Sequence, residues 1–155
     1  MSGGRSRGQE PNDTARINGP VTLDALHGSP LLLVLTLAGD ALCFVFAVFG
    51  ELTGRRRMPH LFWWILWLAQ VPLAIAAVAG IGLFATGARP RTPYHFMYDA
   101  LILLTLLALY LLRPGGALRA ALDERTYRES RWMALLVLFL GGLVGRAYMT
   151  GTLGR

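Results

Sequence analysis

The chain has 155 residues, of which 54% are hydrophobic and 15% are charged. A soluble helical bundle alternates polar and apolar faces, but residues 61–88 carry no charged side chain. The net charge of +6 would suggest nucleic-acid binding in a soluble domain, whereas here the arginines gather at the ends of apolar segments, where they set membrane topology. Cys43 is the only cysteine, which excludes a disulfide framework and a dithiol redox pair. Composition therefore favours a membrane protein without a nucleic-acid partner.

Residues 1–29 are rich in Gly, Ser, Asn, Asp and Pro and lack the apolar core of a signal peptide. We predict that they form a disordered polar tail, which the chain keeps. Ser29 followed by Pro30 is a typical N-cap and first-turn pair, so the first long helix is expected to begin there. Residues 30–155 then form a single domain.

Four apolar segments make up most of that domain, at about residues 31–50, 61–88, 93–112 and 132–150. Each is close to the roughly 20 residues that an α-helix needs to cross a hydrocarbon core ~30 Å thick. The predicted fold is therefore all-α, a polytopic four-helix membrane bundle with short loops. Pro72 predicts a kink in the second span, because it lacks the N–H that would bond the carbonyl of Leu68.

The loop arginines predict the orientation of the bundle. The first and third loops lie on the same side, since two spans separate them, and together they hold eight of the 15 basic residues: Arg55, Arg56, Arg57, Arg113, Arg119, Arg125, Arg128 and Arg131. Short arginine-rich loops stay in the cytoplasm. We therefore predict that both termini and the loop at about residues 87–92 lie outside, in a bacterial cytoplasmic (inner) membrane.

Glycines on two spans predict close helix contacts. Gly80 and Gly82 lie in the second span, and Gly141, Gly142 and Gly145 lie in the fourth. Small residues let helix backbones approach each other in a membrane. They favour packing within the chain, against other membrane subunits or against a second copy.

Three ionisable residues lie inside the spans, namely Asp40, Asp99 and Arg146. A charge at the bilayer centre costs roughly 2.5–3.5 kcal/mol even on the lenient insertion scale. At about 1.5 Å per residue, Asp99 and Arg146 both lie roughly 6–10 Å below the outer boundary, so we predict that they pair and dock the third helix on the fourth. Asp40 and Gln70 both lie near the midplane, and Gln70 is the expected hydrogen-bond partner of a protonated Asp40.

Histidines raise the alternative of a cofactor, because two histidines on facing helices commonly hold b-type haem. His27 and His95 share the predicted outer side, and Tyr98 and Tyr148 fall near the same boundary. These four residues are the candidate cofactor site. A second interpretation needs no cofactor, with His95 as an interfacial residue that bonds Asp99 or Tyr148.

Part of the chain resembles a pattern in uncharacterised bacterial four-helix membrane proteins, which are similar in a general way to cytochrome b-like bundles. The similarity covers about residues 90–151 and is carried by residues 90–99 (PRTPYHFMYD), Arg128-Glu129 and residues 145–151 (GRAYMTG). The chain differs at Asp99, where the pattern has glycine, and it has no histidine inside the first span. The resemblance implies one outer-side cluster of His95, Tyr98, Arg146 and Thr150.

No Ser, His and Asp set, paired metal ligands or HExxH sequence is present, so neither an enzyme nor a metal site is favoured. The function we favour is a non-catalytic accessory or structural subunit of a larger membrane complex, which contacts lipid and partner helices. One alternative is a redox subunit associated with haem b or quinone through His95. Another is a small proton-coupled transporter that uses Asp40 and Asp99.

Overall fold

The computed structural model describes residues 22–90, 92–122 and 127–152, and within these ranges every regular element is a helix. The helices are α1 (Leu23–His27), α2 (Pro30–Leu52), α3 (His60–Ala69), α4 (Val71–Ala85), α5 (Tyr94–Leu112), α6 (Ala117–Ala121) and α7 (Glu129–Thr152). Four stretches are long and apolar enough to cross a membrane: Leu23–Leu52, His60–Ala85, Tyr94–Leu112 and Glu129–Gly151. This confirms the prediction of four helices with the length and composition of membrane spans.

The N-terminal boundary differs from the prediction. Ser29 caps α2 by accepting a hydrogen bond from the backbone N–H of Leu32, and Pro30 is the first helical residue, as predicted. The predicted polar tail, however, extends to residue 29, whereas residues 23–27 already form α1. Thr22 caps this short helix through the N–H of Ala25. The rest of the predicted tail, residues 1–21, lies outside the described residues.

The second span is divided at Gln70. Helix α3 ends one residue before it and α4 begins one residue after it. Pro72 has no N–H to offer the carbonyl of Leu68, so the regular helical bonding is interrupted there. Gln70 is therefore the C-cap residue of α3 and the N-cap residue of α4.

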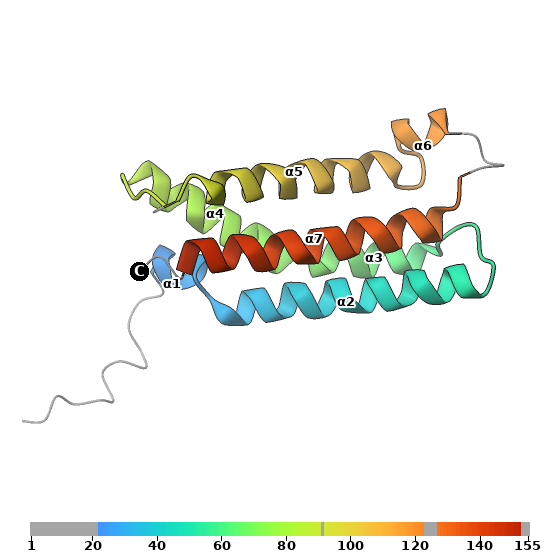
Figure 1. The fold of residues 1–155 in the computed structure, drawn as a ribbon, viewed down its shortest axis with the longest axis horizontal. Coiled ribbons are helices and arrows are strands. Elements are labelled where there is room, and N and C mark those ends of the chain that lie inside the picture. Colours follow the sequence, from blue (N-terminus) through green and yellow to red (C-terminus); the bar gives the residue numbers. More distant parts are fainter. Residues whose placement is uncertain (1–21, 91, 123–126, 153–155) are drawn as a thin grey trace, which may run out of the picture.

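The long helices lie side by side, with α7 at the centre of the packing (Figure 1). Helix α7 packs against α2 on one side and α5 on the other, while α2 also packs on α3 and α4, and α1 lies on α4. The start of α2 and the end of α7 lie at the same end of the bundle (Figure 1). We call this the histidine end, because it holds His27 and His95, and the opposite end, with Arg55, Arg119 and Arg128, the arginine end.

The core follows α7. Met133, Val137 and Leu140 on this helix are completely buried, against Phe62 and Leu66 of α3 among other residues. Outside this core, most side chains of the spans face outward, and at most 33% of the most apolar part of any span is buried. The exposed surface of the bundle is thus suited to lipid or to other apolar helices.

Helices α2 and α3 approach closely at Gly39. A Cβ atom added at Gly39 would meet the Cβ of Ala69 and lie 3.2 Å from its Cα. The next residues on the two helices are Asp40 and Gln70, so the same contact brings these polar side chains together. Sequence reasoning singled out other glycines and missed this one, because no pattern in the sequence marks Ala69 as its neighbour.

We expect Gly39→Ala to lower the free energy of unfolding by about 1–3 kcal/mol, the usual cost of overpacking, because the new methyl group overlaps Ala69. The midpoint of thermal unfolding in mild detergent measures this loss. Gly145→Ala is the matched control, since nothing lies within 4 Å of its Cβ position. That variant should match or exceed the wild type, because alanine favours helix over glycine. Equal midpoints of thermal unfolding for Gly39→Ala and the wild type would contradict the close contact between Gly39 and Ala69.

Candidate functional site

Two histidines meet at the histidine end. His27 is the last residue of α1 and His95 is the second residue of α5. Their rings contact each other edge to face, with centroids 5.7 Å apart and an interplanar angle of 87°. The structure therefore brings together two residues that are 68 positions apart in the sequence and that sequence analysis placed on one side.

Main-chain carbonyls orient both rings. His27 Nδ1 lies 2.9 Å from the carbonyl oxygen of Ala76, and His95 Nδ1 lies 3.1 Å from that of Ala147. A carbonyl only accepts hydrogen bonds, so each Nδ1 carries the proton and donates it. In the neutral form of each ring, Nε2 then has a free lone pair, which is the arrangement that ligand-binding histidines commonly have.

Small residues make room for the two rings. A Cβ atom at Gly80 of α4 would lie 2.7 Å from the His27 ring, and one at Gly151 would lie 3.1 Å from His95 Cε1. His95 Nδ1 is also 3.4 Å from the Thr150 hydroxyl. Gly80 was predicted to let a helix approach, and the element that approaches it is α1.

The predicted pair between Asp99 and Arg146 is not formed. Asp99 Oδ2 instead lies 3.6 Å from His95 Nε2, one helical turn away, and the Arg146 side chain is exposed on α7. Asp99 shares a face of α5 with Phe96, three residues before it, and with Tyr110, eleven residues after it. Both spacings are close to whole helical turns.

The position of Arg146 on α7 explains the correction. Asp99 lies between residues that contact three helices: Phe96 contacts Phe84 on α4, Tyr110 contacts Trp67 on α3, and His95 bonds the main chain of α7. Arg146 is turned away from the bundle on α7. The two residues therefore point in different directions around their helices.

The other two residues of the candidate cofactor site are partly buried. Tyr98 packs against the core, and Tyr148 lies on α7 near its end. The resemblance implied a cluster of His95, Tyr98, Arg146 and Thr150. Of these, His95 and Thr150 are in contact, whereas the exposed Arg146 side chain lies outside the histidine contact.

Asp40 and Gln70 are in contact in the middle of the bundle. Gln70 Nε2 donates a hydrogen bond of 2.8 Å to Asp40 Oδ1, and both side chains are buried. Gln70 sits at the break between α3 and α4, and Asp40 is on α2. The polar pair thus joins the first span to the break in the second.

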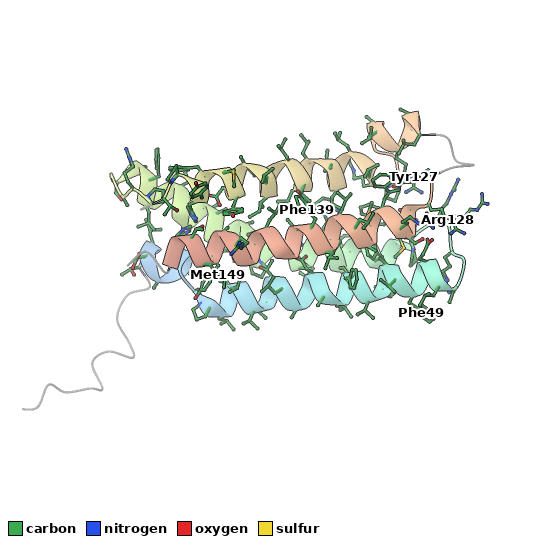
Figure 2. The ribbon with its side chains drawn as sticks, in the orientation of Figure 1. Phe49, Tyr127, Arg128, Phe139 and Met149 are labelled. Atoms are coloured by element: carbon green, nitrogen blue, oxygen red, sulfur yellow. The ribbon has the colours of Figure 1, made fainter. Side chains whose placement is uncertain are left out.

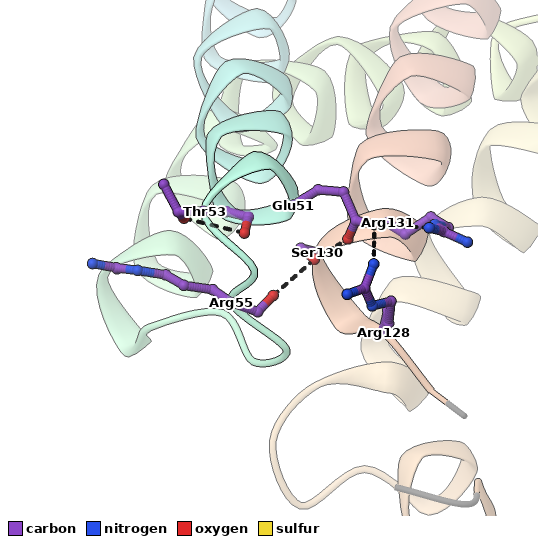
Figure 3. Close-up of polar contacts among 7 residues, drawn as sticks. Glu51, Thr53, Arg55, Arg128, Ser130 and Arg131 are labelled. Atoms are coloured by element: carbon purple, nitrogen blue, oxygen red, sulfur yellow. Dashed lines mark hydrogen bonds and ion pairs between the residues drawn. The ribbon is translucent and has the colours of Figure 1, made fainter. Parts of the chain in front are cut away.

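A carboxylate that sequence analysis did not single out organises the arginine end. Glu51, near the end of α2, accepts hydrogen bonds of 2.8 and 2.9 Å from Arg128 and Arg131. The Ser130 hydroxyl lies 2.7 Å from Glu51 Oε2 and 3.0 Å from the carbonyl oxygen of Arg55 (Figure 3). These contacts tie the end of α2 and the first loop to the first turn of α7.

Glu129, the first residue of α7, is completely buried beside this group. Its carboxylate accepts a hydrogen bond of 3.2 Å from Trp63 Nε1 and forms an ion pair of 3.0 Å with Arg119. Burial, and secondarily the Glu129 charge, raise the pKa of the neighbouring Tyr127 phenol to about 12, so Tyr127 is neutral at physiological pH. Through its contacts with Trp63 and Arg119, Glu129 holds α3 and the third loop against α7.

These contacts define the class of protein: an all-helical chain with four helices able to cross a membrane and polar clusters at its middle and at both ends. No protein-family model, curated protein or solved structure matches the chain. In the described part of the chain, no three His, Cys, Asp or Glu side chains are arranged to hold a metal ion. The contacts themselves are therefore the guide to function.

We expect His27→Ala to release α1 from α4, because the substitution removes the bond to the Ala76 carbonyl and the packing on Gly80. Loss of one hydrogen bond, worth about 1 kcal/mol, should speed amide hydrogen exchange of residues 23–27 by roughly fivefold. Mass spectrometry of the exchanged protein in detergent measures this rate. His60→Ala is the control, since His60 is exposed at the other end. Unchanged exchange in His27→Ala would show that other contacts hold α1.

We expect Glu129→Ala to lower the free energy of unfolding by about 3 kcal/mol, because it leaves the Trp63 N–H and the Arg119 guanidinium without their partner. Glu129→Gln keeps an acceptor for Trp63 and removes only the charge, so its loss should be smaller. Thermal unfolding followed by tryptophan fluorescence measures both variants. A wild-type midpoint in Glu129→Ala would rule out this role for the buried carboxylate.

Proposed function

We propose that the protein is a small multi-pass subunit of a larger membrane complex, with an accessory or structural role and no reaction of its own. Its surface supports this role. The four spans leave most of their apolar side chains facing outward. The observation that carries the proposal is one outward face of α7.

This face of α7 combines apolar side chains with a glycine and an arginine. Its members are exposed and follow one another at helical spacing: Leu135, Phe139, Gly142, Arg146 and Met149. Figure 2 labels two of them, Phe139 and Met149. Nothing lies within 4 Å of the Cβ position of Gly142. A neighbouring helix can therefore approach the backbone of α7 at this point.

Arg146 makes a protein partner preferable to lipid on this face. It lies five residues before Gly151, where the span ends, and so roughly 7.5 Å inside the boundary. A charge at such a site is costly in hydrocarbon unless the side chain extends to the interface or an oxygen atom accepts its hydrogen bonds. A partner helix that packs on Gly142 would place a carbonyl, amide or carboxylate oxygen within reach of the guanidinium.

The proposal includes a location and an orientation. We place the protein in the bacterial cytoplasmic membrane, with the arginine end in the cytoplasm and the histidine end outside. The support is the number of arginines in the loop regions of one end. Those in the described residues are Arg55, Arg56, Arg57, Arg113, Arg119, Arg128 and Arg131.

A redox subunit that binds haem b or quinone is the second candidate, because His27 and His95 meet at one site with both Nδ1 atoms bonded to carbonyls. Their rings already touch, so a porphyrin between them requires α1 to move away from α4. A dithionite-reduced minus oxidised absorbance spectrum tests this candidate. A b-type α-band that disappears in His95→Ala would support it, and a featureless spectrum from folded protein would remove it.

The subunit role is tested by photocrosslinking in the native membrane. We expect a photoreactive residue at Leu135, on the proposed face, to crosslink to another membrane protein, and one at Val45, exposed on α2, to crosslink mainly to lipid. Arg146→Leu should weaken the protein crosslink roughly tenfold, since one interhelical hydrogen bond in a membrane is worth about 1–2 kcal/mol. Only lipid adducts at both positions would contradict the proposal.

A further inference from the structure

Two buried oxygen atoms in the middle of the bundle lack partners. Asp40 is 3% exposed and Gln70 is 7% exposed. Their single hydrogen bond joins Gln70 Nε2 to Asp40 Oδ1. Asp40 Oδ2 and Gln70 Oε1 are both buried, and neither has a hydrogen-bond partner among the described residues. Buried polar atoms are nearly always paired in folded proteins, so this pair of exceptions needs an explanation.

An ionised Asp40 cannot provide that explanation. A carboxylate and an amide oxygen both only accept hydrogen bonds, so neither orphaned atom can satisfy the other. The negative charge would also be buried between apolar helices without a cation, because in the described chain no arginine or histidine contacts Asp40.

A proton on Asp40 Oδ2 would remove both the unpaired acceptor atoms and the buried negative charge. The protonated oxygen becomes a donor, and Gln70 Oε1 is the acceptor on the side chain that already binds Oδ1. In that form the carboxylic acid can donate to the amide that already donates to it, and the negative charge is removed. We propose that Asp40 and Gln70 form a binding site for an exchangeable proton, which the carboxylate takes from hydronium, leaving water, and returns to water as hydronium.

Among the residues that the structure describes, Asp40 is the strongly acidic group at this site. On α2, Cys43 lies one turn beyond it, and Thr36, one turn before, uses its hydroxyl on the carbonyl of Leu32. Helix α7 presents Gly141, whose Cβ position would lie 3.8 Å from Asp40 Oδ2. Within the described chain, the Cys43 thiol is a second titratable group in the immediate surroundings of Asp40.

The site is connected to the break in the second span. Gln70 is the residue between α3 and α4, and the contact of Gly39 with Ala69 holds it beside Asp40. Loss of the proton would place two acceptor oxygens against each other and push the Gln70 side chain away. The occupancy of the site is therefore linked to the geometry of the helix break, a feature that membrane proteins use to line sites for ions and protons.

Infrared spectroscopy of the full chain in lipid vesicles, in H2O and in D2O, tests this proposal. We expect a carbonyl band of a protonated carboxylic acid that shifts in D2O and is missing in Asp40→Asn, a variant of the same shape that can still bond Gln70. In Gln70→Leu the band should persist at higher frequency, because the O–H group has lost its acceptor. Circular dichroism of each variant reports whether it is folded.

Three outcomes would overturn the proposal. A spectrum in which Asp40→Asn removes a carboxylate band instead shows that Asp40 is ionised. A carboxylate band that appears only in sodium buffer would make the bound cation sodium. A band that does not shift in D2O would mean that the proton does not exchange. If Asp40→Asn fails to fold, the higher frequency of the carbonyl band expected in Gln70→Leu remains a separate test.

Discussion

Hydrogen bonds of polar side chains that are buried among the apolar helices shape the structure. Water is absent from an apolar interior, so an unpaired polar group there costs more than at a solvated surface. His95 bonds the main chain of α7, Glu129 bonds Trp63 of α3, and Asp40 bonds Gln70. In every case the bond joins two different helices and so fixes which helices are neighbours.

The two ends of the bundle are held by different kinds of contact. At the arginine end, Glu51 and Glu129 gather the loops through charged hydrogen bonds, which suits a surface in contact with water and lipid headgroups. At the histidine end, two histidine rings and two glycines bring α1 onto α4 and α5 onto α7. Asp99 lies beside the Nε2 atom of His95 at this end.

Helix α7 links these contacts to the proposed role in a complex. Its inner face is the core of the bundle, with Val137 and Leu140 completely buried. Its outer face carries Gly142 and Arg146, for which the described residues provide no packing partner or bond. Helix α7 is thus central within the chain and also presents the face on which we propose that a partner helix packs. The proton site proposed at Asp40 lies on the buried side of α7.

The sequence by itself determined the four long helices, the start of α2 at Pro30, the interruption near Pro72 and the shared depth of Asp40 and Gln70. Length and hydrophobicity fix these features because they report position along a helix axis. Only the tertiary structure decided that Asp99 faces His95 and Arg146 faces outward, that Glu129 is buried and that α1 lies on Gly80. These features depend on the rotation of each helix about its axis and on the choice of neighbouring helix. Spans that are apolar all round leave both undetermined in the sequence.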